Sequence, residues 1–360
     1  MAQQPQPTRV SHAPDLFRLD GRVALVTGGA GLLGRRYCEA LLQAGARVVI
    51  GDLDGERARA LATELNSRCG SGEAEPGDPA HGDAAHRDAA HGEAAHREAA
   101  HGEAAHGEAE LGGVKRGQAA HGEVESADGA RTQGAGEQSA SALGLELDVT
   151  KPNSVGQAVI HAVTTFNRLD ILVNNAALTV RGGSEHLSPV DYFAPLEDYK
   201  LDVWDQALRT NLTGMLLCAQ AAGRQMLRQD PPGGVIVNIA STYGVVAPDQ
   251  RLYEGVKSPY AETGFNTPVS YAVTKTAVLG LTRYLATYWG SKNIRVNALT
   301  PHGVFDNHDE TFVRNFVYRS PMGRMARNDE YRGALLFLVS DASSYMTGAN
   351  LIVDGGWTAW

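Results

Sequence analysis

Arg22-Val-Ala-Leu-Val-Thr27, followed directly by Gly28-Gly-Ala-Gly-Leu-Leu-Gly34, is the strongest fold signal in this chain. Its first six residues predict a short buried strand, and the amphipathic segment after the glycines, residues 35–44, predicts a helix. A strand, glycine turn and helix in this order bind dinucleotides, because the glycines let the backbone approach a pyrophosphate that the helix N-terminus also faces. A glycine cluster alone is weak evidence for this function, so the next strand matters.

A second apolar strand is predicted at Ala46-Arg-Val-Val-Ile-Gly-Asp52. Asp52 closes it about 20 residues past the glycine turn, where a carboxylate can accept hydrogen bonds from the hydroxyls of an adenosine ribose. The same carboxylate would repel a 2′-phosphate, and Gly31 stands where an arginine could otherwise bind that phosphate. These residues favour NAD over NADP. The alternative for Asp52 is a solvated residue in the turn 51–55.

Tyr271 and Lys275 stand four residues apart in an apolar run that predicts a helix, so both side chains lie on one helix face. An ammonium lowers the pKa of a neighbouring phenol, which makes such a pair a plausible proton-transfer device. A phenol needs roughly 4 kcal/mol to act as a base near neutral pH, and two unit charges about 4 Å apart could supply most of it. Alone, the pair fits an ordinary amphipathic helix surface better than a catalytic site.

Taken together, the motifs of this chain resemble those of a classical short-chain dehydrogenase/reductase. They occur in that family's order and cover the chain apart from residues 1–20 and one insertion. The resemblance implies an α/β fold, with a single doubly wound Rossmann domain over residues 21–360, a seven-stranded parallel sheet and a nicotinamide cofactor. The matching motifs are Thr27-Gly-Gly-Ala-Gly-Leu-Leu-Gly34, Asn174-Asn-Ala-Ala177, Asn211, Ser241, Tyr271 with Lys275, the tail 340–348, and Val353-Asp-Gly-Gly356.

The resemblance also implies a catalytic set of Asn211, Ser241, Tyr271 and Lys275. Ser241 follows the apolar run 235–240, at the carboxyl end of a predicted strand, and would hold the reacting oxygen while Tyr271 moves its proton. Lys275 would bind the nicotinamide ribose, and Asn211 would help a water chain to reach Lys275. Singly, Ser241 fits a turn residue and Asn211 a polar residue interrupting a helix. The candidate cofactor-binding residues are Gly28, Gly31, Leu32, Leu33, Gly34, Asp52, Asp148, Val149, Asn175, Tyr271, Lys275, Pro301 and Val304.

Three positions depart from the family pattern. Leu32 replaces the middle glycine of Thr-Gly-x-x-x-Gly-x-Gly, which implies a slightly different turn and weakens the discrimination against NADP. Ala177 replaces the glycine of Asn-Asn-Ala-Gly and needs the space of only one additional methyl group. His302 stands where a glycine is common, either as a loop residue without a role or as a polar group near the substrate.

Composition fits one large domain, since 43% of the 360 residues are hydrophobic. The formal charge of −9 argues against a nucleic-acid partner. No apolar run approaches the about 20 residues of a membrane span, and residues 1–20 predict a flexible arm without a signal peptide. Three cysteines without ligand spacing favour a reducing cytoplasm and no metal site. The family resemblance implies a homodimer or homotetramer.

Residues 69–142 form an insertion that repeats in fives, as in His81-Gly-Asp-Ala-Ala and His86-Arg-Asp-Ala-Ala. Successive histidines would step around a helix by about 140°, so they line no single face. The scarcity of large apolar residues predicts disorder. Seven of the twelve histidines lie here, at positions 81, 86, 91, 96, 101, 106 and 121. Metal binding is the alternative to an expanded simple repeat.

Three loops that follow predicted strands, 178–202, 242–270 and 305–324, interleave aromatic and basic residues, which suits a polyhydroxylated or anionic small molecule. Surface solvation explains most of these residues equally well. The stretch 241–250 and the tail 354–360 resemble bacterial dehydrogenases of surface-sugar biosynthesis, which implies oxidoreduction between a secondary alcohol and a ketone on a sugar or sugar phosphate. The alternatives are a 3-oxoacyl thioester reductase and a non-catalytic nucleotide-sensing or scaffold protein. The loop residues concerned are Arg181, His186, Tyr192, Tyr199, Tyr243, Arg251, Tyr253, Lys257, Tyr260, His308, Arg314 and Arg319.

Overall fold

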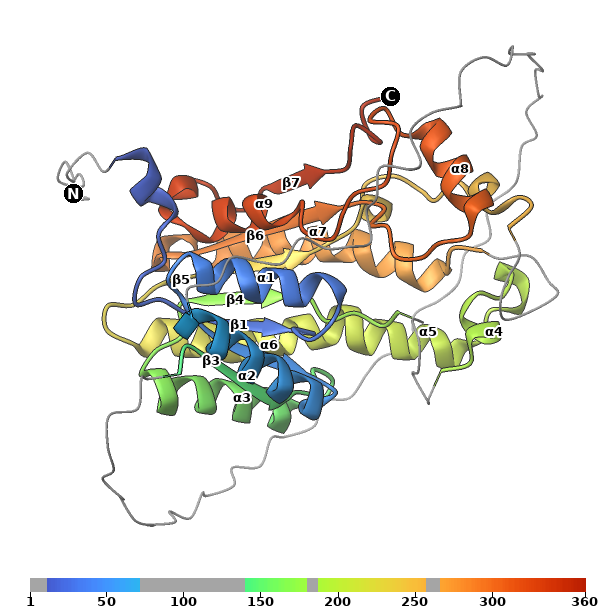
Figure 1. The fold of residues 1–360 in the computed structure, drawn as a ribbon. Helices are drawn as coiled ribbons and strands as arrows, with labels where there is room; N and C mark the ends of the chain where they lie inside the picture. Colours follow the sequence, from blue (N-terminus) through green and yellow to red (C-terminus); the bar gives the residue numbers. More distant parts are fainter. Residues whose placement is uncertain (1–11, 72–139, 180–186, 257–265) are drawn as a thin grey trace. The chain divides into compact units, whose positions relative to one another are not determined.

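The computed structural model describes residues 12–71, 140–179, 187–256 and 266–360, which form one Rossmann-like α/β domain (Figure 1). Its centre is a seven-stranded parallel sheet in the order β3-β2-β1-β4-β5-β6-β7. The predicted fold class is therefore confirmed. The strands are β1 (Val23–Thr27), β2 (Arg47–Asp52), β3 (Ala142–Glu146), β4 (Ile171–Asn174), β5 (Gly234–Ile239), β6 (Ile294–Pro301) and β7 (Asn350–Val353).

Helices cover both faces of the sheet, which is why β1 is buried along its whole length. Helices α1, α2 and α9 contribute to the core on one face, where Leu41, Leu61 and Leu338 pack. Helices α3, α6 and α7 contribute to the core on the other face. The helices are α1 (Leu32–Gln43), α2 (Gly55–Ser71), α3 (Pro152–Phe166), α4 (Pro189–Tyr192), α5 (Leu201–Leu208), α6 (Gly214–Arg228), α7 (Val269–Trp289), α8 (Glu310–Arg319) and α9 (Arg332–Val339).

The strand order reverses its direction of growth between β1 and β4. In open parallel sheets this reversal opens a crevice at the carboxyl ends of the two strands, and ligands bind there. The glycine turn follows β1, and Asn175 follows β4. The topology therefore puts the two expected cofactor motifs at one edge of the sheet.

The expected insertion and arm fall partly outside the described residues. Helix α2 runs to Ser71, two residues past the predicted start of the insertion at 69, and β3 begins at Ala142. The histidine repeat lies outside the description. Within the expected arm, residues 13–17 form a short 3-10 helix and Leu19 is fully buried, so the packed domain begins before position 21.

Asn66 joins α2 to the start of β3. Its side-chain oxygen accepts hydrogen bonds from the amides of Ser141 and Ala142 at 3.0 and 2.8 Å. Its side-chain nitrogen donates to the Ala142 carbonyl at 2.9 Å. The two flanks of the insertion are thus fastened to each other within the described domain.

Candidate active site

The glycine turn after β1 leaves no space for a side chain at Gly28 or Gly34. Gly28 has a φ of +62°, and a Cβ there would lie 2.9 Å from the Cα of Ala176. A Cβ on Gly34 would lie 2.1 Å from the Gly28 carbonyl oxygen. Helix α1 begins at Leu32 with Gly31 as its N-cap, so its free amides face the turn. Leu32, which replaces the family glycine, is the first helical residue, and Leu33 packs partly against the core.

Asp52 reaches the glycine turn. Its carboxylate accepts a hydrogen bond from the Ala30 amide at 2.9 Å and another from the Asp54 amide at 3.2 Å. Arg57 in the first turn of α2 donates to the Ala30 carbonyl at 3.1 Å. Sequence reasoning missed Arg57, whose only signal is its place five residues after Asp52. An acid and a base therefore both contact the same residue of the turn.

Asn175 fastens β4 to β1 at the crevice. Its side-chain amide donates to the carbonyls of Thr27 and Gly28 at 3.1 and 2.9 Å. The hydroxyl of Thr27 accepts from the amides of Asn175 and Ala176, each at 3.0 Å. Four hydrogen bonds thus hold the two motifs in one register. Thr27 is a positioning residue absent from the predicted cofactor set.

Asp148 and Val149 follow β3 on the same edge. Asp148 accepts from the amide of Thr150 at 2.9 Å and makes an ion pair with Lys151 at 3.0 Å, so it organises its own turn. Val149 is 7% exposed, and a Cβ on Gly214 would lie 2.7 Å from its side chain. Both predicted residues are therefore held in place at the carboxyl end of the strand.

Tyr271 and Lys275 lie together on α7. Lys275 is 3% exposed, its Nζ lies 5.6 Å from the centroid of the Tyr271 ring, and it donates to the Ile239 carbonyl at 2.8 Å. Burial lowers the pKa of Lys275 to about 8, because desolvation disfavours its charged form. The ammonium is therefore fixed between the tyrosine and the end of β5.

Ser241 begins the turn that packs against this helix. It precedes the short 3-10 helix 242–244, and its hydroxyl accepts from the Tyr243 amide at 3.2 Å. A Cβ on Gly244 would lie 2.5 Å from the Lys275 carbonyl oxygen, so the turn and α7 touch through their backbones. The structure thereby brings the serine turn against the helix that carries Tyr271 and Lys275.

Asn211 sits in a π-helical turn, residues 209–213, between α5 and α6. It is 1% exposed, accepts from the Leu178 amide at 2.6 Å and donates to the Thr274 hydroxyl at 3.2 Å. Thr274 directly precedes Lys275. Asn211 therefore contacts the neighbour of the lysine, at the kind of helix bulge that is frequent at functional sites.

Tyrosines from the loops 178–202 and 242–270 lie around Tyr271. Burial raises the pKa of Tyr192, and the nearby Tyr271 raises it further. Burial also raises the pKa of Tyr243 and of Tyr253, with contributions from Tyr271 in each case. The Tyr199 hydroxyl lies 2.7 Å from that of Ser270, next to Tyr271. Sequence reasoning named these tyrosines only as loop residues. Arg181, His186, Lys257 and Tyr260 lie outside the described residues.

His302 is buried among aromatic side chains at the end of β6. It is 8% exposed, and its ring centroid lies 4.3 Å from that of Trp357 and 5.0 Å from that of Phe316. Burial lowers its pKa to about 4, so the imidazole is neutral at pH 7. Its Nε2 has no hydrogen-bond partner among the described atoms. His302 is therefore not a solvated residue, and its two predicted roles, a loop residue without a function and a polar group near the substrate, both stay predictions.

Pro301 ends β6, and Val304 forms an isolated parallel bridge with Ala326. The bridge uses the Phe305 amide, which donates to the Ala326 carbonyl, and the Gly303 carbonyl, which accepts from the Ala326 amide, each at 2.9 Å. Because strand residues alternate, the amide of Val304 itself points to the opposite edge. The family resemblance implies that this amide binds the carboxamide of the nicotinamide.

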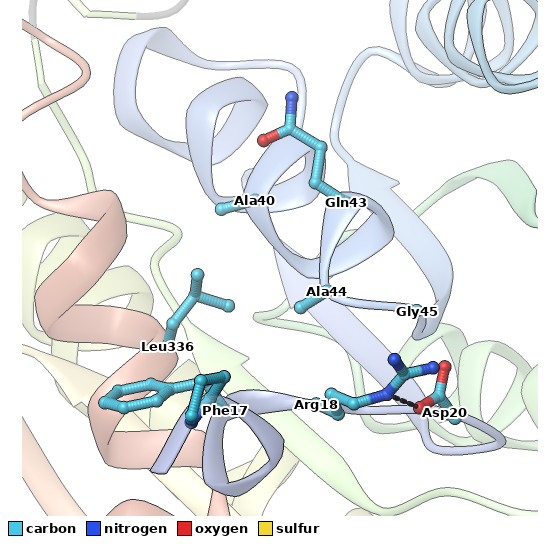
Figure 2. Close-up of a pocket in the computed structure, with 9 residues that line it drawn as sticks. Phe17, Arg18, Asp20, Ala40, Gln43, Ala44, Gly45 and Leu336 are labelled. Atoms are coloured by element: carbon cyan, nitrogen blue, oxygen red, sulfur yellow. Dashed lines mark hydrogen bonds and ion pairs between the residues drawn. The ribbon is translucent and has the colours of Figure 1, made fainter. Parts of the chain in front are cut away.

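A surface hollow elsewhere on the domain lies away from these residues. It is lined by the turn around Phe17, the end of α1 and Leu336 of α9 (Figure 2). Asp20 and Gly45, which also line it, precede β1 and β2, so the hollow is at the amino edge of the sheet. Parallel α/β sheets bind ligands at the other edge.

No group of three or more histidine, cysteine, aspartate or glutamate side chains within the described ranges could hold a metal ion. None of the described helices combines the length and apolarity needed to cross a bilayer.

Comparison with known proteins identifies the family. A family model described as short chain dehydrogenase matches residues 22–98 and 119–254, and one described as Enoyl-(Acyl carrier protein) reductase matches residues 256–358. D-threitol dehydrogenase of Mycolicibacterium smegmatis is 30% identical over 350 residues, 95% of each chain. The 2-dehydro-3-deoxy-D-gluconate 5-dehydrogenase of Escherichia coli is 32% identical over 60% of this chain and 76% of its own.

A solved structure agrees with this result. The crystal structure of a gluconate 5-dehydrogenase from Burkholderia cenocepacia in complex with NADP and tartrate has a TM-score of 0.66 and 26% identity, covering 97% of this chain and 100% of that one. The Rossmann-like fold of the described residues agrees with this neighbour. This chain is an oxidoreductase that belongs to the short-chain dehydrogenase/reductase family.

Proposed function

We propose that this enzyme interconverts a secondary alcohol and a ketone on a polyhydroxylated small molecule, with NAD as the cofactor. The observation that carries the proposal is the contact between the Ser241 turn and the buried face of α7 that bears Tyr271 and Lys275. These groups stand at the carboxyl edge of the sheet, the edge that also carries the glycine turn. A pure nucleotide sensor has no need of such a proton device.

Each of the three side chains has one task in the oxidation direction. Ser241 orients the substrate hydroxyl, and Tyr271 accepts its proton. Lys275 is mostly charged at pH 7, because its pKa is about 8. At the 5.6 Å between Nζ and the Tyr271 ring, this charge would stabilise a phenolate by about 3 kcal/mol at an effective dielectric near 20. When bound, the nicotinamide supplies the hydride acceptor.

The residues at the glycine turn fit a dinucleotide. Gly28 and Gly34 leave the backbone bare for a pyrophosphate, and α1 offers its N-terminal amides. The carboxylate of Asp52, held at Ala30, favours ribose hydroxyls over a 2′-phosphate. Arg57 at the same residue is the feature that would favour NADP, which the related gluconate 5-dehydrogenase binds. We propose that the carboxylate prevails and that NAD is preferred.

Asp52→Ser tests this preference. The variant is expected to lose NAD turnover and to gain roughly tenfold in kcat/KM for NADP, about 1.4 kcal/mol, because Arg57 is then unopposed. Glu56→Gln, which removes an acidic side chain from the first turn of the same helix, is the matched control and should leave the ratio unchanged. An unchanged ratio in Asp52→Ser would refute the role of the carboxylate.

The tyrosine cluster supports a sugar-like substrate. Phenol rings pack against the CH faces of polyols, and their hydroxyls pair with substrate hydroxyls. The relatives named for D-threitol and gluconate agree with such a substrate. The alternative is a 3-oxoacyl thioester reductase, which would favour a basic patch for a carrier protein. Arg251 and Arg319 near the site are both paired with Asp249, which argues against that patch.

A substrate panel separates these candidates. Purified enzyme would be assayed by NADH absorbance with D-threitol, gluconate and other polyols, and with acetoacetyl-CoA in the reverse direction. We expect turnover with a polyol or sugar acid. Activity confined to the thioester would establish the alternative.

Tyr271→Phe tests the proton device. The variant is expected to keep NAD binding, measured by calorimetry, and to lose at least a hundredfold in kcat, in line with general base catalysis. Tyr284→Phe makes the same change on an exposed part of α7 and serves as the control. A Tyr271→Phe enzyme with most of its activity would contradict the mechanism.

The remaining sequence-based assignments stay predictions. They are the cytoplasmic location, the homodimer or homotetramer, and the narrower likeness to enzymes of bacterial surface-sugar biosynthesis, which the relatives named above do not address.

A further inference from the structure

Tyr331 contacts both backbone polar groups of His302. The tyrosine is 1% exposed and directly precedes α9. Its hydroxyl donates to the His302 carbonyl and accepts from the His302 amide at 3.3 Å. One side-chain oxygen, 29 residues away in sequence, therefore serves the whole peptide backbone of position 302.

This contact lies directly after the last residue of β6 that pairs with a neighbouring strand. Pro301 is the last residue of β6 to pair with β7, opposite Val353. The next residue has no strand beside it, and its buried amide and carbonyl need other partners. The Tyr331 hydroxyl is the partner of both groups, so it takes the place of the strand-to-strand hydrogen bonds at the first position of the loop 302–305.

The segment that leads into Tyr331 also holds the far end of this loop. Ala326 bonds to Gly303 and Phe305 on either side of Val304. Gly303 has a φ of +38°, and a Cβ there would lie 2.1 Å from the Phe316 ring, so the loop is pressed against α8. Residues 326–331 thus hold 302–305 at two points, and between them the Val304 amide faces the expected nicotinamide side.

We propose that Tyr331 is a positioning residue for the nicotinamide, whose hydroxyl fixes the His302 peptide groups and so aims the Val304 amide at the carboxamide. The inference rests on the proposed NAD-dependent function. Burial raises the pKa of Tyr331 to about 12, so the phenol stays a hydrogen-bond donor over the working range of pH. The ring itself packs in the core with Leu335 and Leu338.

The chain offers a matched control in Tyr37. This tyrosine on α1 is fully buried in the same core, and its hydroxyl has no partner among the described atoms. Tyr331→Phe and Tyr37→Phe each delete one buried phenol oxygen and keep the ring. Only the first deletion removes hydrogen bonds to the loop.

The experiment compares NAD with ADP-ribose, which shares every group except the nicotinamide. Calorimetry on Tyr331→Phe is expected to show about tenfold weaker NAD binding and unchanged ADP-ribose binding. Tyr37→Phe should bind both as the wild type does. The ligand-induced rise in Tm gives the same comparison if a variant proves too unstable to titrate.

The outcomes separate cleanly. Equal NAD affinity in the two variants overturns the inference. Equal weakening of NAD and ADP-ribose by Tyr331→Phe also overturns it, because the role is then general support of the fold. A wild-type enzyme that binds neither ligand refutes the proposed cofactor itself, which is a different failure.

Discussion

Lys275→Met is expected to make the protein more stable at neutral pH while abolishing its activity. The wild-type ammonium is buried, and its pKa falls from 10.5 to about 8 because of that burial. Below pH 8 the folded protein carries the buried charge. Between pH 8 and 10.5 the folded state releases the proton and the unfolded state retains it, so stability rises with pH.

The magnitude follows from the shift. A difference of roughly 2.5 pKa units corresponds to about 3 kcal/mol of destabilisation well below pH 8. About 2 kcal/mol of it should disappear between pH 7 and pH 9.5. Methionine fills similar space without the charge, but it leaves the Ile239 carbonyl without its 2.8 Å hydrogen bond, a loss of about 1–2 kcal/mol. The net gain for the variant at pH 7 is therefore about 1–2 kcal/mol.

Urea unfolding followed by tryptophan fluorescence, at one protomer concentration and at several values of pH from 7 to 9.5, measures this gap. Buried tyrosines such as Tyr192, whose pKa is raised, act equally in both proteins and cancel in the difference. Lys292→Met removes an exposed lysine just past α7 and is the control. A Lys275→Met protein that is less stable than the wild type at pH 7, or a gap that does not narrow with pH, would refute the reasoning.

Two further substitutions probe the glycine turn and helix α8. Gly34→Ala places a Cβ 2.1 Å from the Gly28 carbonyl oxygen. We therefore expect roughly 1–3 kcal/mol of destabilisation and a more than tenfold rise in the Kd for NAD, both measured by calorimetry. A normal affinity for NAD would contradict the role of this turn in cofactor binding. Arg319→Met removes the 2.7 Å ion pair between α8 and Asp249, which lies in the loop 242–270 that is expected to contact the substrate. We expect the substrate KM to rise several-fold and the stability to fall by about 1 kcal/mol. Steady-state kinetics with an unchanged KM would contradict a role of this ion pair in substrate binding.

The sheet could be predicted from sequence because its strands are local signals. Apolar runs such as 46–52 and 235–240 became strands within one residue of their expected bounds, since a buried parallel strand needs little else. The glycine turn was equally legible, because close backbone contact at Gly28 and Gly34 excludes every other residue. The start of α1 at Leu32, three residues before the expected position 35, is the sort of boundary that local patterns fix poorly.

Contacts made only by tertiary packing could not be predicted. The gathering of tyrosines around Tyr271 joins loops whose paths no periodicity encodes. The sequence alone does not decide between the two roles of His302, because the burial of its side chain depends on Phe316 and Trp357 from elsewhere in the chain. The contact of Arg57 with the glycine turn likewise could not be predicted, because it depends on how α2 packs against that turn.

The amide clasp of Asn66 bears on how this gene can change over time. Tandem repeats of five residues can gain or lose copies, and such a change in length next to a strand could shift the register of that strand. Here the side chain of Asn66 ties Ser141 and Ala142 to α2 whatever number of units lies between. The sheet should therefore keep its register in relatives that carry fewer or more of these units.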